Sequence, residues 1–147
     1  MFNAYNKKRI IHINGNIIIA SVVSTLIVAL IIESAKSIMV SMSAVVGVTA
    51  VLDMILDAGI FFTLHYLSSN YGKAHIRNYF LAKDVVRIHG HRIFLSPLFY
   101  FIAVSTQSGL LMMHAGYGTS VIWAYLIALV ITRYVHTVYG IKTGLFK

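Results

Sequence analysis

The chain has 147 residues, of which 59% are hydrophobic and only 11% are charged, and its formal net charge is +8. A soluble domain of this size needs a more polar surface, so the expected solvent is lipid, and the positive charge then predicts contact with anionic lipid headgroups instead of nucleic acid. The chain has no cysteine, which excludes disulfides, thiolate zinc sites, iron–sulfur clusters and c-type haem attachment.

Four apolar segments are long enough to cross a bilayer as helices, which takes about 20 residues each. The expected spans cover approximately residues 12–33, 38–67, 93–113 and 119–141 of a single polytopic membrane domain, 1–147. The first span follows a basic start, but Glu33 stands where a signal-peptide cut after Ala35 would require a small residue. We therefore expect an uncleaved anchor, and the predicted fold class is an all-α, four-helix membrane bundle.

The second span, 38–67, is the longest of the four, and we expect it to tilt or to project from the membrane. Ser43 and Gly47 stand four residues apart within it, so they lie on one face of a helix. Small residues at this spacing are typical of close helix–helix contacts in membranes. The pair is therefore predicted to be a packing surface.

A polar, basic segment, 68–92, separates the second span from the third. Its apolar residues recur at roughly helical spacing among five basic ones, Lys73, Arg77, Lys83, Arg87 and Arg92. This pattern fits an amphipathic helix that lies on the membrane surface and binds anionic lipid, and it fits a solvated loop equally well. Ser96 and Pro97 follow shortly afterwards, and they predict either the start of the third helix or a kink in a longer one.

The basic residues also predict the orientation of the spans. Ten of the twelve Lys and Arg residues fall before the first span, within 68–92 or after the fourth span, whereas the opposite side holds only Lys36. An even number of spans places these three regions on one side. The positive-inside rule then places both termini in the cytoplasm, and the expected location is the cell membrane.

Charged residues inside the apolar spans are the strongest functional signal in the sequence. Asp53 and Asp57 fall within the second span, and the fourth span holds Arg133 and His136. At about 1.5 Å per residue, Asp53 and Arg133 both lie about 20 Å from the outer ends of their helices, close to mid-membrane. Asp53 and Asp57 share one face of their helix because they are four residues apart. Arg133 and His136, three residues apart, likewise share a face. The sequence therefore predicts an Asp–Arg pair, with Gln107 of the third span in the same polar layer.

The first and third spans contribute further polar residues at comparable depth, namely Ser24, Thr25, Ser105 and Thr106. Such a layer can fix the register of a bundle by interhelical hydrogen bonds, can relay a proton or an ion, or can support catalysis. Removing one partner of a buried ion pair strands a charge in a low dielectric, which costs on the order of 3–5 kcal/mol.

Seven histidines are a high count for this length. His89 and His91 offer two imidazoles to a metal, with His65 as a candidate third ligand, although no carboxylate has ligand-like spacing to the pair. His65 and His136 both fall in the inner halves of their spans, where a b-type haem would need its axial ligands. Hydrogen-bonded or solvated histidines without a cofactor are the alternative interpretation.

The sequence supports three functional hypotheses. The leading one is a non-catalytic subunit of a larger membrane complex, in which the polar layer fixes helix packing. The second is a homo-oligomeric, proton-coupled transporter or a translocator of a lipid-linked substrate, in which Asp53 or Asp57 carries the proton and Arg133 competes for it or holds an anionic substrate. The third is a metal-dependent membrane enzyme that uses the histidines of the cytoplasmic side. Nucleophilic catalysis has no support in the sequence, since no nucleophile elbow or phosphate-binding loop is present.

Overall fold

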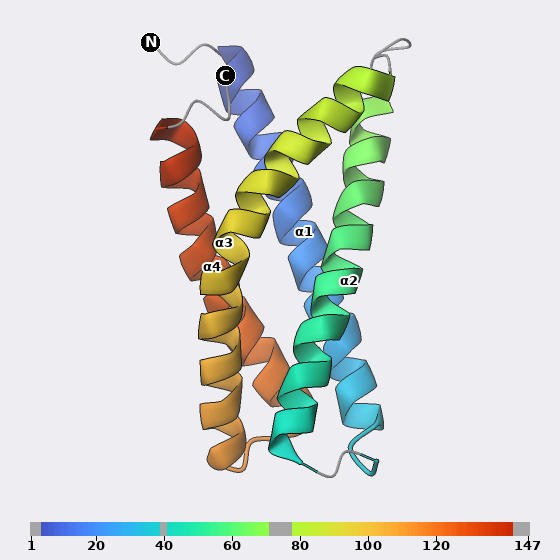
Figure 1. The fold of residues 1–147 in the computed structure, drawn as a ribbon, viewed down its shortest axis with the longest axis vertical. Coiled ribbons are helices and arrows are strands. Elements are labelled where there is room, and N and C mark those ends of the chain that lie inside the picture. The colour runs from blue at the N-terminus through green and yellow to red at the C-terminus, as the bar shows by residue number, and fades with distance from the viewer. Residues whose placement is uncertain (1–3, 39–40, 71–77, 143–147) are drawn as a thin grey trace.

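The computed structural model describes the backbone of residues 4–38, 41–70 and 78–142, and this part of the chain forms four α-helices. They are α1 (Ala4–Ser34), α2 (Met42–Asn70), α3 (Asn78–Met112) and α4 (Tyr117–Lys142), shown in Figure 1. Each helix contains a segment that is long and apolar enough to cross a membrane, which confirms the prediction of an all-α fold with four candidate spans. These segments are Asn14–Ser34, Met42–Leu67, Phe94–Met112 and Tyr117–Tyr139.

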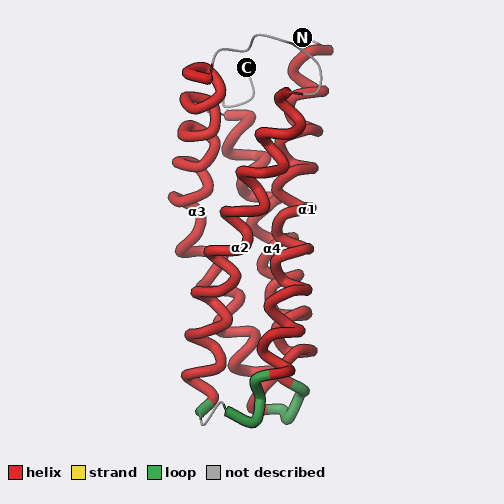
Figure 2. The backbone as a smooth tube through the Cα atoms, turned by 90° about the vertical axis from the view of Figure 1, so that its right-hand side faces the viewer, coloured by secondary structure: helices red, strands yellow, loops and turns green. Residues whose placement is uncertain are grey.

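Successive helices run in opposite directions and form a closed ring. Each helix packs against its neighbours in the chain, and α1 also packs along α4 (Figure 2). The connections from α1 to α2 and from α3 to α4 lie at one end of the bundle, which we call the hairpin end (Figure 1). The start of α1 and the end of α4 lie at the opposite end, which we call the terminal end.

Local hydrogen bonds explain why the second helix begins later than predicted. Ile38 lies in a turn, in which its N–H donates to the carbonyl oxygen of Ala35 at 2.9 Å, and α2 begins only at Met42. The Ser41 hydroxyl accepts a hydrogen bond from the Ala44 N–H at 3.2 Å, as the residue that caps a helix N-terminus does. Hydropathy does not reveal this boundary because the residues before the cap are also apolar.

The segment between the second and third spans also differs from its prediction. Residues 78–92 were expected to form a surface helix or a loop, but they are the first part of α3, a continuous helix of 35 residues. At about 1.5 Å per residue, α3 is roughly 50 Å long, whereas the hydrocarbon core of a bilayer is about 30 Å thick. Pro97 lies inside this helix, and the helix changes direction along its length in Figure 1, as a helix does where proline removes a backbone hydrogen bond.

The first and last helices are tied together at the hairpin end. One carboxylate oxygen of Glu33, Oε2, accepts a hydrogen bond from the Gly118 N–H at 2.9 Å, in the first turn of α4. The other oxygen, Oε1, accepts one from the Lys36 ammonium at 2.8 Å, and this hydrogen bond raises the pKa of Lys36. Glu33 therefore joins the end of α1 to a helix N-terminus, where a negative charge is favourable.

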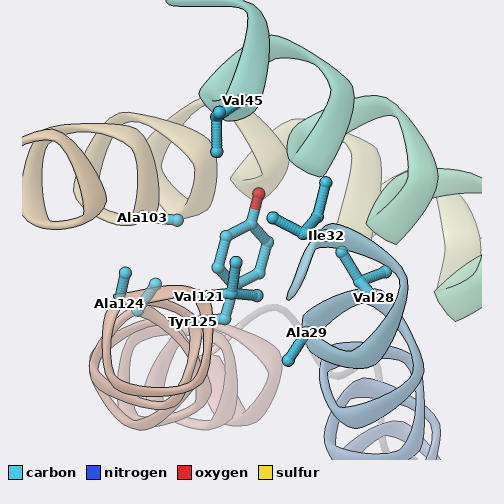
Figure 3. Close-up of a cluster of buried hydrophobic side chains, with 9 residues drawn as sticks. Val28, Ala29, Ile32, Val45, Ala103, Val121, Ala124 and Tyr125 are labelled. Carbon is cyan, nitrogen blue, oxygen red and sulfur yellow. The ribbon is translucent and has the colours of Figure 1, made fainter. Parts of the chain in front are cut away.

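The interior near the hairpin end is an apolar cluster built from all four helices (Figure 3). Its members are Val28, Ala29, Ile32, Val45, Ala103, Val121, Ala124, Tyr125 and Ala128. Several are alanines, whose small side chains let helices approach closely. A smaller cluster of Ile17, Ala20 and Phe61 lies nearer the terminal end.

The exterior of the bundle is apolar as well. Leu30, Phe101 and Tyr134 are 70%, 71% and 74% exposed. A surface of this kind is unfavourable in water and is suited to contact with lipid chains.

Candidate functional site

A polar pocket lies at the middle of the bundle, between the two apolar clusters. All four helices line it, with Ser21 from α1, Asp53 and Asp57 from α2, Leu95, Ser96, Phe99 and Tyr100 from α3, and Leu129, Thr132 and Arg133 from α4. Its volume is about 50 Å³, which is room for a few water molecules. The structure therefore brings the two aspartates and the arginine of the predicted polar layer into one pocket.

A stripe along α2 explains how both aspartates reach this pocket. The residues at every fourth position of the helix point to the same side, and they are Val45, Thr49, Asp53, Asp57, Phe61 and His65. Asp57 is half-buried, and the other five are buried. Beyond the carboxylates the stripe continues with the aromatic residues Phe61 and His65, and before them it contains Thr49 and the apolar Val45. The acidic groups consequently sit at the centre of the bundle and far from either end.

Hydroxyl groups hold the carboxylate oxygens in place. The Ser21 hydroxyl donates to Asp57 Oδ1 at 2.8 Å, and the Ser24 hydroxyl donates to Asp53 Oδ1 at 2.9 Å. On the other side of the pocket, the Tyr100 hydroxyl donates to Asp53 Oδ2 at 3.4 Å. Hydrogen bonds to a charged acceptor are among the stronger ones in proteins. The serines of α1 therefore fix the register of α1 against α2.

Arg133 supplies the positive charge of the pocket. It is half-buried on α4, next to the buried Thr132, whose hydroxyl donates to the Ala128 carbonyl oxygen at 2.8 Å. Two carboxylates and one guanidinium line the same small space, so the charges of the lining residues do not balance when all three groups are ionised.

Gln107 lies outside the pocket, in contrast to its predicted place in the same layer. Its amide nitrogen, Nε2, donates to Thr49 Oγ1 at 3.2 Å, and Thr49 stands one helical turn before Asp53 on α2. Tyr125 of α4 is fully buried, and its ring packs against Phe99 of the pocket wall with centroids 5.7 Å apart. We call Thr49, Gln107 and Tyr125 the second polar layer.

Two buried histidines, His65 and His136, lie beyond the pocket on the terminal side, whereas His114 is exposed in the turn between α3 and α4 at the hairpin end. His136 is 0% exposed, one turn beyond Arg133, and His65 is 6% exposed and stacks on Phe61 with ring centroids 5.6 Å apart. Neither lines the pocket. The side chains of His89 and His91 are outside the described residues. Within the residues that the structure describes, no three metal-ligating side chains are grouped, and a metal or b-type haem site stays a prediction.

The basic residues predicted to contact lipid also lie outside the described side chains. Lys73 and Arg77 fall in the undescribed stretch 71–77, and Lys83, Arg87 and Arg92 belong to the part of α3 of which only the backbone is described. Their contact with anionic headgroups stays a prediction. The helix that contains Lys83, Arg87 and Arg92 is nevertheless continuous with the third candidate span.

Sequence reasoning missed several pocket residues for identifiable reasons. Tyr100 lies seven residues into the third predicted span, and at that depth an aromatic residue indicates the membrane interface. Because α3 starts at Asn78, Tyr100 is in fact near the middle of the helix. Ser21 precedes Ser24 by three residues, so the two share a helix face, and this spacing could have predicted that Ser21 belongs to the polar layer. Ser105, predicted at comparable depth, is exposed.

Comparison with known proteins finds no match for this chain. No protein-family model matches the chain, no curated protein matches it, and no solved structure matches its fold.

Proposed function

We propose that this chain is an integral protein of the cell membrane, with both termini in the cytoplasm, that moves protons through the pocket between Asp53, Asp57 and Arg133. Four apolar helices and an apolar exterior support insertion into the membrane. The distribution of Lys and Arg supports the orientation. The observation that carries the proposal of proton transport is a pocket of water-binding size that holds these three ionisable groups inside an apolar bundle.

The charge of the lining residues supports a single cation as the transported species. With all three groups ionised, the charges of the two carboxylates and the guanidinium that line the pocket sum to one negative charge. One proton, on a carboxylate or on the neighbouring His136, brings that sum to zero. Its volume of about 50 Å³ is well below the roughly 300–1,000 Å³ of pockets for larger organic ligands, which argues against a lipid-linked substrate.

Each lining group has a distinct role in this proposal. The carboxylates of Asp53 and Asp57 take up and release the proton, and the hydroxyls of Ser21 and Ser24 orient the carboxylate oxygens. The guanidinium of Arg133 competes with the proton for the carboxylates and so promotes its release. Water in the pocket connects the groups.

Proton flux into liposomes tests this function. The purified protein is reconstituted with a trapped pH-sensitive dye, and a potassium diffusion potential drives protons inward. Wild-type protein is expected to acidify the lumen faster than protein-free liposomes, and Asp53→Asn and Asp57→Asn are expected to return the rate to the protein-free value. Circular dichroism and size-exclusion chromatography establish that each variant is folded.

Ser34→Ala is the matched control for these variants. The Ser34 hydroxyl is exposed and donates only to the carbonyl oxygen of Leu30 in its own helix, at 2.8 Å, so its loss is expected to leave the flux unchanged. Wild-type liposomes that are no more permeable to protons than protein-free ones, at every pH tested, would rule out the proposed function.

A non-catalytic subunit of a larger membrane complex is the second candidate, and the position of Ser43 and Gly47 favours it. Both residues are exposed, and a Cβ added to Gly47 would meet no atom within 4 Å outside its own stretch of helix. A helix that packs closely on this face must therefore belong to another subunit or to a second copy of this chain.

Native mass spectrometry of the protein, gently extracted from its own membrane, separates these arrangements. Different subunits at fixed stoichiometry support the role of a complex subunit, and a homo-oligomer supports an independent transporter. A monomer contradicts the use of the Ser43/Gly47 face for packing.

A further inference from the structure

Two polar atoms of the second polar layer have no hydrogen-bond partner within the part of the chain that the structure describes. They are the Tyr125 hydroxyl and the Gln107 carbonyl oxygen, Oε1, and the two side chains are 1% and 0% exposed. Buried polar groups are nearly always bonded to another protein group or to ordered water, because an unsatisfied group loses its hydration without compensation. Two such atoms in one layer therefore indicate a bound molecule.

The orientation of the Gln107 amide follows from the hydrogen bonds of its neighbour. The Thr49 hydroxyl donates its hydrogen to the Val45 carbonyl oxygen at 2.6 Å, so toward Gln107 it can act only as an acceptor. The amide must therefore turn its NH₂ group to Thr49, at 3.2 Å, and its carbonyl oxygen to the other side. As a result, Gln107 Oε1 needs a donor, and the Tyr125 hydroxyl needs an acceptor.

Two apolar side chains flank the Tyr125 hydroxyl. It points away from α4 toward the centre of the bundle, between Val45 and Ile32 (Figure 3). A water molecule supplies both of the missing functions, since it accepts a hydrogen bond from Tyr125 and donates one to Gln107 Oε1. Water therefore satisfies both the Tyr125 hydroxyl and Gln107 Oε1, and it brings no charge into this apolar cluster.

This layer adjoins the pocket of the proposed proton pathway. Phe99 lines the pocket, and its ring packs against Tyr125 on one side and against Tyr100, at 5.0 Å between centroids, on the other. Tyr100 in turn donates to Asp53. Thr49 lies one turn from Asp53 toward the hairpin end. Polar groups therefore continue from the carboxylates into the second polar layer.

We propose that a buried water molecule binds between the Tyr125 hydroxyl and Gln107 Oε1 and extends the hydration of the pocket by one helical turn toward the hairpin end. The binding site stands on the geometry of these two side chains. Only its consequence, a path for the proton beyond Asp53, rests on the proposed function.

Hydroxyl-radical footprinting of the intact protein in detergent micelles tests the water site directly. X-ray radiolysis of a bound water produces a radical beside the side chain that holds it, so a buried residue next to such a water is oxidised. Tyr125 is expected to be oxidised at a rate approaching that of Tyr66, which is 54% exposed at the terminal end of the second candidate span. Phe61, which is 0% exposed in an apolar cluster, is the matched buried control and is expected to be protected.

The variant Gln107→Leu removes the acceptor for the water. It is expected to lower the oxidation rate of Tyr125 severalfold and to leave that of Tyr66 unchanged. Protection of Tyr125 equal to that of Phe61 in the wild-type protein would overturn the proposal, and so would an unchanged rate in Gln107→Leu.

Footprinting does not require transport, so the two proposals fail separately. If Tyr125 is oxidised but the liposomes show no proton flux, the water site is supported and the proposed function is rejected. If the liposomes show proton flux but Tyr125 is protected from oxidation, the proposed function is supported and the water site is rejected.

Discussion

The hydroxyls that bond to the carboxylates are the residues on which the pocket geometry most directly depends. Ser21 and Ser24 come from α1, whereas Asp53 and Asp57 come from α2, so each hydrogen bond joins two helices. A carboxylate in an apolar interior has no bulk water to replace a lost donor. The serines consequently matter for both stability and orientation.

Replacing either serine is expected to destabilise the bundle. Ser21→Ala and Ser24→Ala each remove one hydrogen bond to a carboxylate, and the free energy of unfolding should fall by about 1–3 kcal/mol. Denaturant titration in detergent, followed by circular dichroism, measures the change. In Ser34→Ala, which loses only a hydrogen bond within its own helix, the free energy of unfolding should fall by less. Equal losses in all three variants would contradict the special role of the pocket serines.

The residues of the pocket were predictable from the sequence only in part. The common depth of Asp53 and Arg133 follows from counting residues along two helices, and that argument does not depend on how the helices rotate. Which further side chains face the pocket depends on the rotation of each helix, and hydropathy does not fix that rotation when the exterior is as apolar as the interior. Ser21 was missed for this reason, whereas Tyr100 was missed because its depth in the predicted span indicated the membrane interface.

Among the helices, α1 and α4 approach each other closely at Gly118. A Cβ at this position would lie 3.1 Å from the Ala29 carbonyl oxygen and 3.4 Å from the Cβ of Glu33. The absence of a side chain therefore permits the contact in which Glu33 accepts the Gly118 N–H. Gly47 of α2 has no such neighbour.

The same substitution at these two glycines should have opposite effects. Gly118→Ala forces α1 and α4 apart, and we expect it to lower the free energy of unfolding by about 1–3 kcal/mol. Gly47→Ala meets no atom and improves helix propensity, so it should be neutral or stabilising by up to about 1 kcal/mol. Thermal unfolding of both variants in detergent provides the comparison. A melting temperature for Gly118→Ala at or above the wild-type value would disprove the close approach.

The helices themselves were predictable, but their limits were not. Apolar length alone identified four spans, because a bilayer-spanning helix needs a long apolar run. The residues 78–92 are helical but polar, and hydropathy does not distinguish a helix that continues a span from a separate surface helix. The turn of α3 into α4 likewise depends on a backbone detail, since His114 adopts a left-handed conformation with φ of 59° and lets the Ala115 N–H bond to Leu110.

For the whole molecule, the antiparallel order of the helices places the start of α1 and the end of α4 at one end and the α1–α2 and α3–α4 connections at the opposite end. The two antiparallel hairpins were predicted from their short connections. The contact of α1 with α4, which closes the ring, was not predicted, because the two helices are the most distant in the chain and no local pattern records their pairing. This contact brings Ser21 to the same pocket as Arg133.

The absence of native cysteine makes the orientation directly testable. Single cysteines replace Ser37, which is exposed at the hairpin end, and Lys142, which is exposed at the end of α4. In intact cells, a membrane-impermeant maleimide should label Ser37→Cys at once and Lys142→Cys only after permeabilisation. The reverse pattern would show that the termini lie outside.

The order in which the helices are synthesised gives the serine–aspartate bonds a role in the membrane insertion that we propose for this chain. Asp53 and Asp57 leave the ribosome some 75 residues before Arg133, by the positions of these residues in the chain. During that interval the guanidinium of Arg133 is not yet present. The α1–α2 hairpin, however, already contains the Ser21 and Ser24 hydroxyls that bond to both carboxylates. The first hairpin thus carries its own partners for the acidic residues into the bilayer, and the arginine joins an assembly that is already formed.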